Sequence, residues 1–165
     1  MLFGENNYKF MYSALVEAES AFENDEVPIG AVVVYDNRIV GRGFNQVEKL
    51  KDATAHAEII ALTSAMNTLS SKVLDECDLY VTAEPCIMCA GAILLAKIRT
   101  VFFSAFEPKF GASGSVYSLL EDNNYNHKPK VYHGLYEMES KNLLEMFFAK
   151  KRKSKKDSEY LPPFH

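Results

Sequence analysis

The sequence predicts an α/β protein with three layers, α/β/α, built around a central mixed sheet of five strands. Segments with the apolar spacing of a helix alternate with short, mostly β-branched runs, and this alternation is typical of sheets covered by helices on both faces. The length of 165 residues and the hydrophobic content of 48% suit one globular domain over 1–165. The sequence shows no internal repeat and no low-complexity linker at which a second domain would begin.

Each element is predicted from its own pattern. Helices are expected where apolar residues recur every three or four positions, in ranges 8–23, 55–69, 85–97 and 140–153. Strands are expected where β-branched and aromatic residues gather in short runs, over 29–35, 38–43, 79–82, 100–104 and 131–133. Asp36-Asn37 suits a turn between the first two strands, and Pro85 suits the first turn of its helix. Residues 44–54 are expected to form a loop.

Composition narrows the class of protein. No stretch approaches the roughly 20 apolar residues that span a bilayer, and the N-terminus MLFGENNYKF lacks the pattern of a signal peptide. Three cysteines, an odd number, favour metal binding or free thiols in a reducing compartment over a disulfide framework. We therefore expect a cytoplasmic protein without a membrane partner.

The charge is unevenly distributed along the chain. The formal net charge is -4, yet residues 150–156 carry six positive charges, and all 22 acidic residues lie outside this segment. A basic helix end and tail, 150–165, would form a local anion-binding feature on an acidic body. The alternative is a solvated helix end that binds nothing.

Two short motifs contain residue types that bind zinc: His56-Ala57-Glu58 and Pro85-Cys86-Ile87-Met88-Cys89. Cys86 and Cys89 are three positions apart at a predicted helix start, so both thiols should lie on one side of its first turn. The positive end of the helix dipole favours the thiolate form that binds metals. His56 also lies at a predicted helix start. If the two starts converge, His56, Cys86 and Cys89 supply three ligands and leave a fourth position for water, which is the pattern of a catalytic zinc site.

Glu58 is the candidate catalytic residue. Two thiolates and a neutral imidazole cancel the charge of the zinc ion, so water at such a site needs a nearby base. A carboxylate two residues after a ligand could take the proton from water and later deliver protons to the ring nitrogen and the leaving amine. Glu58 as a fourth ligand is disfavoured, because no base would then remain.

Other interpretations of these residues were weighed. A Cys-x-x-Cys pair also occurs in redox proteins and zinc ribbons, but a ribbon needs a second pair, which the sequence lacks. Cys77 has no ligand spacing to either motif and is expected to be a small buried residue. The other histidines are expected at the surface or behind the ligands: His127, His133 and His165.

His-x-Glu followed by Pro-Cys-x-x-Cys is the motif of the zinc-dependent nucleobase deaminases. The chain resembles the cytidine deaminase-like superfamily and, within it, the bacterial tRNA adenosine deaminases, over most of its length from about Glu26 to Arg152. The narrower resemblance rests on features outside the zinc motif: Ala90-Gly91-Ala92, Gly111-Ala112-Ser113-Gly114-Ser115, Asn126-His127 and Phe147-Phe148. The chain departs from the family pattern at Ala53, where proline is common, and at Glu107, where aspartate is usual.

The resemblance implies the fold of that superfamily, one zinc ion per subunit and a homodimer. It implies that adenosine becomes inosine at the wobble position of a tRNA anticodon, as zinc-bound water attacks C6, Glu58 shuttles protons and ammonia leaves. Asn45 and the backbone of Ala57 would hold the flipped purine. The anticodon loop would follow a path along Lys109, Ser115, Asn126 and Phe147, and the basic tail would contact its phosphates.

Two competing functions stay open from the sequence. A free purine base deaminase, such as a guanine deaminase, would share the zinc motif but would need neither the basic tail nor the loop 111–115. A non-catalytic, zinc-stabilised RNA-binding subunit would share the fold, but it would have no use for Glu58.

Overall fold

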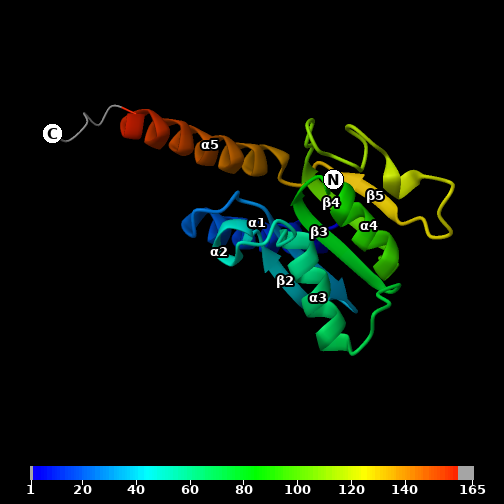
Figure 1. Cartoon of the computed structure of the whole chain (residues 1–165). Helices are drawn as coiled ribbons and strands as arrows, with labels where there is room; N and C mark the ends of the chain where they lie inside the picture. The colour runs from blue at the N-terminus through cyan, green and yellow to red at the C-terminus, as the bar shows by residue number, and fades with distance from the viewer. Residues whose placement is uncertain (1, 160–165) are drawn as a thin grey trace.

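The computed structural model of the chain describes residues 2–159 and contains one mixed sheet with the strand order β2-β1-β3-β4-β5 (Figure 1). The strands are β1 (Gly30–Tyr35), β2 (Arg38–Phe44), β3 (Cys77–Ala83), β4 (Thr100–Ala105) and β5 (Lys130–His133). The helices are α1 (Glu5–Glu23), α2 (Val47–Leu50), α3 (Ala57–Leu69), α4 (Ile87–Ala96) and α5 (Glu137–Glu159), with a 3₁₀ turn η1 (Leu119–Glu121). Strand β1 runs antiparallel to β2 and β3, while β3, β4 and β5 are parallel.

The prediction of three layers around a five-stranded mixed sheet is confirmed. Alternate residues of β1 face opposite sides: Ala31 and Val33 join a core with α3 and α4, whereas Val32 and Val34 join a second core with α1. All five predicted strands form, with ends that move by one to a few residues. Parallel strands β3 and β4 are connected through α4, as a crossover requires.

Two details of the predicted elements are wrong. Residues 44–54 are not entirely a loop, because Val47–Leu50 form α2. Pro85 is not in the first turn of its helix, because Cys86 is the cap of α4 and Pro85 precedes it. Both errors concern local helix starts, which depend on contacts from elsewhere in the chain.

Three glycines let helices lie unusually close to the sheet: Gly30, Gly41 and Gly43. A Cβ atom at Gly30 would lie 2.1 Å from the Ala14 carbonyl oxygen of α1, and one at Gly43 would lie 2.4 Å from the Ala57 carbonyl oxygen of α3. Any larger side chain would push the helix away. The contact at Gly43 therefore fixes the first turn of α3, which directly follows His56.

The segments that lead into His56-Ala57-Glu58 and Pro85-Cys86-Ile87-Met88-Cys89 meet at one edge of the sheet. The start of β1 and the end of β3 meet there, where the Gly30 amide donates to Thr82 Oγ1 at 3.1 Å. Strand β4 ends beside β3, since Ala83 pairs with Ala105. Among the helices of residues 2–159, none combines the length and apolar character that a bilayer crossing requires.

Candidate metal centre

The starts of α3 and α4 converge and bring three ligand types together. His56 is the cap of α3, and Cys86 is the cap of α4, with Cys89 in its first turn. His56 Nδ1 lies 3.6 Å from the Sγ atoms of both Cys86 and Cys89. Within the described part of the chain, these three residues form the group whose ligand atoms all lie within 4.8 Å of one another.

The cluster fits a zinc ion. A tetrahedral zinc ion with bonds of about 2.3 Å to sulfur and about 2.0 Å to nitrogen holds those atoms about 3.6 Å apart. The separation between His56 Nδ1 and each cysteine Sγ has this value. Sulfur and nitrogen donors of this kind suit zinc, whereas magnesium and calcium prefer oxygen.

The electrostatics of the cluster favour a thiolate at Cys86. Hydrogen bonding with the Cys89 thiol, and then with the His56 ring, lowers the pKa of Cys86 to about 4. The same contact with Cys86 raises the pKa of His56 and, together with burial, raises the pKa of Cys89. Before any metal binds, the first negative charge therefore resides on Cys86.

Glu58 is a buried carboxyl group beside this cluster. It lies in the first turn of α3 and is 4% exposed. Burial is the main cause that raises the pKa of Glu58 to about 7, and the charges of Cys86 and His56 also act on it. A carboxyl group with a pKa near neutrality can both accept and donate a proton, as general acid–base work requires.

Asn45 and Ala57 lie at the same edge as the metal ligands. The Asn45 amide donates to the Ile29 carbonyl oxygen at 3.1 Å, and Asn45 is 7% exposed. The next amide, from Gln46, donates to the Ala55 carbonyl oxygen at 3.0 Å, which joins this segment to the chain before His56. Ala57 is the first residue of α3 and is fully buried.

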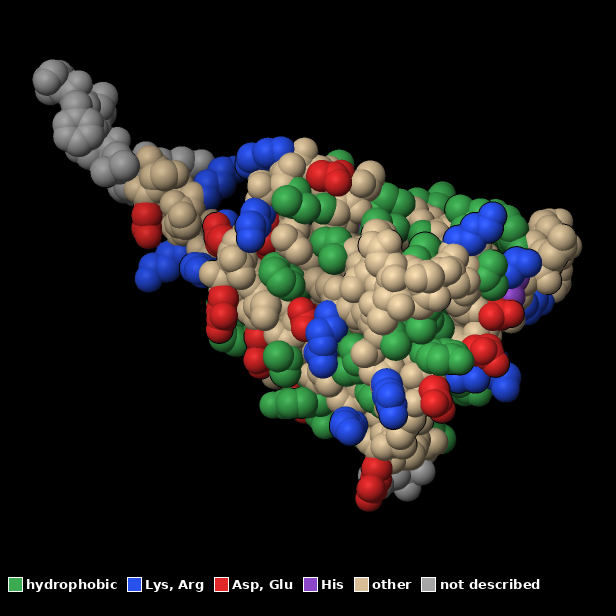
Figure 2. Space-filling model, turned by 90° about the horizontal axis from the view of Figure 1, so that it is seen from below, with side chains coloured by type: hydrophobic (Ala, Val, Ile, Leu, Met, Phe, Trp, Pro, Cys, Tyr) green, Lys and Arg blue, Asp and Glu red, His purple; other side chains and the backbone are tan. Residues whose placement is uncertain are grey.

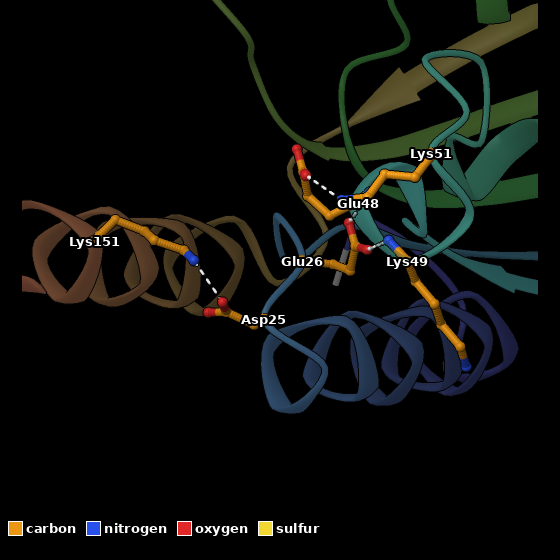
Figure 3. A network of polar contacts seen from close by, with 6 residues as sticks. All are labelled: Asp25, Glu26, Glu48, Lys49, Lys51 and Lys151. Atoms are coloured by element: carbon orange, nitrogen blue, oxygen red, sulfur yellow. Dashed lines mark hydrogen bonds and ion pairs between the residues drawn. The ribbon is translucent and has the colours of Figure 1, made fainter. Parts of the chain in front are cut away.

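Glu26, which no sequence motif marks as functional, holds the segment that follows Asn45 (Figure 3). Glu26 is 1% exposed, and its carboxylate accepts hydrogen bonds from the backbone amides of Glu48 at 3.1 Å and Lys49 at 2.7 Å. These amides lie at the start of α2, whose own cap residue provides no side-chain bond. A carboxylate at a helix N-terminus satisfies its free amides and its dipole. Glu26 thus accounts for the unexpected α2.

A turn at Asp52 shapes the backbone shortly before His56. Asp52 Oδ1 accepts hydrogen bonds from the Thr54 amide at 2.8 Å and the Thr54 hydroxyl at 2.7 Å. These bonds lower the pKa of the Asp52 carboxyl group. The turn restricts the backbone at Ala53, where the chain departs from the family pattern, through side-chain bonding.

Lys109 and Ser115 belong to the segment 106–118 after β4, which we call the β4 loop. Lys109 is exposed, and its amide donates to Glu107 Oε1 at 3.0 Å. Ser115 donates to the buried carboxylate of Glu84 with both its amide, at 2.8 Å, and its hydroxyl. The loop is therefore tied to the residue two positions before Cys86.

Asn126 is not brought to the metal cluster within this chain, and Phe147 is buried against α1. Asn126 is exposed and precedes β5, whose first residue pairs with Thr100 at the start of β4. The ligands lie at the other end of β4, on the order of 15 Å away at the rise of a strand. Phe147 is 4% exposed and packs against Phe22 of α1, with ring centroids 6.2 Å apart.

Comparison with known proteins identifies the family. The sequence model of the MafB19-like deaminase family matches residues 5–152. A tRNA-specific adenosine deaminase of Agrobacterium fabrum is 49% identical over 87% of this chain and 94% of its own length.

Solved structures agree with this result. A structure from a study of A-to-I editing by tRNA:A34 deaminases is 48% identical and covers 82% of this chain and 99% of its own, with a TM-score of 0.80. A guanine deaminase of Bacillus subtilis is 39% identical but covers 59% of this chain and 63% of its own, with a TM-score of 0.57. The chain belongs to the MafB19-like deaminase family and, within it, to the relatives of the tRNA-specific adenosine deaminases.

Proposed function

We propose that this protein is a zinc-dependent deaminase that converts adenosine to inosine at the wobble position of a tRNA anticodon. The observation that carries the proposal is the cluster of His56, Cys86 and Cys89 with the buried carboxyl group of Glu58 beside it. The similarity to tRNA-specific adenosine deaminases over most of both chains supports the choice of substrate.

His56, Cys86 and Cys89 would hold one zinc ion per chain. When bound, zinc would act as a Lewis acid that makes water a better nucleophile at neutral pH. The rest of the reaction needs proton transfers, and Glu58 is the titratable group in place for them. Overall, water adds at C6 of adenine, the bond from C6 to the amino nitrogen breaks, and ammonia leaves.

Glu58 would perform these transfers in order. Its carboxylate removes a proton from water and delivers it to N1 of the ring. It then takes the remaining proton from the hydroxyl group added at C6 and passes it to the departing amino group, so that ammonia leaves and a C6 carbonyl remains. The pKa of about 7 that burial gives Glu58 keeps both protonation states accessible. Asn45 would orient the purine by hydrogen bonds from its side chain, and the Ala57 backbone would lie beside it.

RNA contacts are proposed for two parts of the chain. One is the β4 loop, in which Lys109 is exposed and Ser115 fixes the backbone through its bonds to Glu84. The other is the far end of α5, where Lys and Arg side chains gather (Figure 2). Phe148, which is 45% exposed, presents a ring at the start of this basic stretch. Aromatic rings and basic side chains in this arrangement suit splayed bases and phosphates.

We also propose that the protein acts as a cytoplasmic homodimer. The support in the structure is a group of large apolar side chains exposed on α4 and on the β4 loop: Ile87, Leu95, Phe110, Val116 and Tyr117. Large apolar side chains that stay exposed on neighbouring segments are typical of a protein interface when they form one patch. Sedimentation of the purified protein tests this proposal, since a monomer at micromolar concentration contradicts it.

The decisive experiment uses the zinc-loaded protein and an anticodon stem-loop RNA with adenosine at the wobble position. Inosine is detected by sequencing, and Glu58→Gln serves as the matched control. We expect inosine from the wild type and none from the variant, with equal zinc content in both. A zinc-loaded wild type that leaves RNA unchanged would overturn the proposal.

Guanine deamination is the second candidate, because guanine deaminases have the related fold and the B. subtilis enzyme is 39% identical. The guanine deaminase matches a smaller share of this chain than the tRNA deaminases do. This difference and the basic end of α5 favour RNA as the substrate. Ammonia release from free guanine, without activity on RNA, would support this alternative.

A further inference from the structure

We propose that Glu84 is a positioning residue that fixes the β4 loop against the metal-binding helix α4 and thereby sets how tightly the RNA binds. The proposal rests on the proposed function in one respect, namely that the β4 loop contacts the RNA. Glu84 is no metal ligand, and it would touch neither zinc nor the base.

Both carboxylate oxygens of Glu84 are used by the β4 loop. Oε1 accepts hydrogen bonds from the amides of Ser113 at 3.0 Å and Ser115 at 2.8 Å. Oε2 accepts from the Glu107 amide at 2.9 Å and from the Ser115 hydroxyl. Four donors from three positions of the loop therefore converge on one side chain.

Within residues 2–159, no ion pair balances this buried charge. Glu84 is 3% exposed, and none of the ion pairs found in residues 2–159 includes it. A buried carboxylate is costly unless hydrogen bonds satisfy it, and backbone amides aimed at a charged acceptor form strong bonds. The loop and the carboxylate consequently stabilise each other, and neither arrangement is expected without the other.

The backbone of the loop is also shaped around this carboxylate. A Cβ atom at Gly111 would lie 2.2 Å from Glu84 Oε2, so only glycine leaves room for the side chain. The next amide, from Ala112, donates to the Pro85 carbonyl oxygen at 2.8 Å, and Gly111 forms an isolated β-bridge with Cys86. These contacts connect the loop directly to the chain that carries the metal ligands.

The same geometry defines the role of Ser115. Because its hydroxyl donates to Glu84, its proton is not available to an RNA acceptor. Ser115 acts as part of the anchor, while Lys109, exposed on the same loop, remains available to a phosphate. Loss of the anchor would displace Lys109 without removing it.

The test compares Glu84→Gln and Gly111→Ala with wild type, all as zinc-loaded full chains. Glutamine keeps the volume of the side chain, but its NH₂ group replaces one carboxylate oxygen and faces loop donors with a donor. The methyl group of alanine at position 111 would occupy the space of the Glu84 carboxylate and displace it. We expect unchanged zinc content, amide exchange in the β4 loop faster by roughly tenfold, and a KM for the stem-loop RNA higher by roughly tenfold. We expect kcat to stay within about twofold of wild type.

Ser140→Ala is the matched control for a loss of stability. The Ser140 hydroxyl donates to Ser104 Oγ at 2.8 Å in a buried contact between α5 and β4, and the Ser104 hydroxyl donates in turn to the Leu135 carbonyl oxygen, so neither hydroxyl bonds to the β4 loop. This variant should be destabilised yet keep the wild-type KM and the wild-type exchange in the loop.

Three results would overturn the role of Glu84: unchanged exchange and KM, loss of zinc from Glu84→Gln, or a fall in kcat at unchanged KM. Inactivity of the wild type on RNA would instead contradict the proposed function. Faster exchange in both variants, measured without RNA, would still support Glu84 as the anchor of the loop.

Discussion

The Nδ1 atom of His56 lies 3.6 Å from the Sγ atom of Cys86, and each residue is the cap of a helix, α3 and α4 respectively. The two helix N-termini therefore point at one place, and their dipoles favour negative charge there. This arrangement explains why the thiolate form is stable at Cys86 and why a dication with thiolate ligands suits the site.

Cys86→Ser should abolish zinc binding and lower the thermal stability of the protein. Structural and catalytic zinc sites add binding free energy to folding, so the loss removes that contribution. Bound zinc per chain and the unfolding temperature, each measured with and without a chelator, check this prediction. A chelator should lower the unfolding temperature of the wild type and leave that of the variant unchanged.

Cys77→Ser is the control for this experiment. Cys77 is 1% exposed at the start of β3, away from the cluster, so its replacement should cost stability but keep full zinc content. Equal zinc content in Cys86→Ser and Cys77→Ser would contradict the assignment of Cys86 as a ligand.

Alkylation should distinguish the cysteines after zinc is removed. Since the pKa of Cys86 is about 4, it is a thiolate at pH 6, whereas burial raises the pKa of Cys77 to about 11. At pH 6 we expect Cys86 to react with iodoacetamide on the order of fivefold faster than free cysteine, because full ionisation outweighs the weaker nucleophilicity of a low-pKa thiolate. Mass spectrometry of digested protein measures the modified sites.

Zinc should protect Cys86 in the same assay, and lowering the pH below about 4 should slow its reaction as the thiolate is protonated. Cys77 should stay unmodified throughout until the protein is unfolded. Rapid labelling of Cys77 in the native protein would contradict its burial.

The sheet and the metal cluster could be predicted because their signals are local in the sequence. A β-branched run such as 30–35 specifies a strand by itself, and Cys86 and Cys89 share a helical turn through their spacing. The position of His56 beside them followed from the resemblance to a known motif. Its physical basis, the convergence of two helix starts, appears only in the fold.

The buried carboxylates Glu26 and Glu84 could not be assigned from the sequence. Their partners are backbone amides 22 to 31 residues further along the chain, and no side-chain pattern marks such a donor. The short helix α2 was missed for the same reason, since four residues show no periodicity and its cap comes from Glu26. The resemblance likewise gave Asn126 and Phe147 as RNA contacts without indicating that Asn126 lies at the other end of β4 from the metal cluster or that Phe147 is buried against α1.

The basic end of α5 should control the salt dependence of RNA binding. Lys151 pairs with Asp25 at 2.6 Å (Figure 3), which holds α5 against the end of α1, whereas Lys153, Lys155 and Lys156 are exposed beyond that contact. Replacing these three lysines with glutamine should weaken binding and reduce the slope of log K against log salt by about 2, as expected for lost phosphate contacts.

Fluorescence anisotropy with a labelled stem-loop RNA, measured from low to high salt, tests this role of α5. Lys72 is exposed and precedes β3 at the opposite edge of the sheet. Lys72→Gln should therefore leave the slope of log K against log salt unchanged. A slope that the triple replacement does not alter would mean that the basic stretch is only a solvated helix end.

Gly43→Ala should damage both stability and the active site. The new methyl group would lie 2.4 Å from the Ala57 carbonyl oxygen, so α3 must shift, at a cost of about 3 kcal/mol for overpacking. That shift acts on the first turn of α3, which carries Glu58 and adjoins His56, so weaker zinc binding should accompany the loss of stability.

Gly91→Ala in α4, where a Cβ atom meets nothing within 4 Å, is the control. It should be neutral or add about 0.5 kcal/mol to the free energy of unfolding, because alanine is the better helix former. Urea unfolding with and without zinc measures both variants, and a Gly43→Ala protein as stable as wild type would contradict the close packing of α3 on β2.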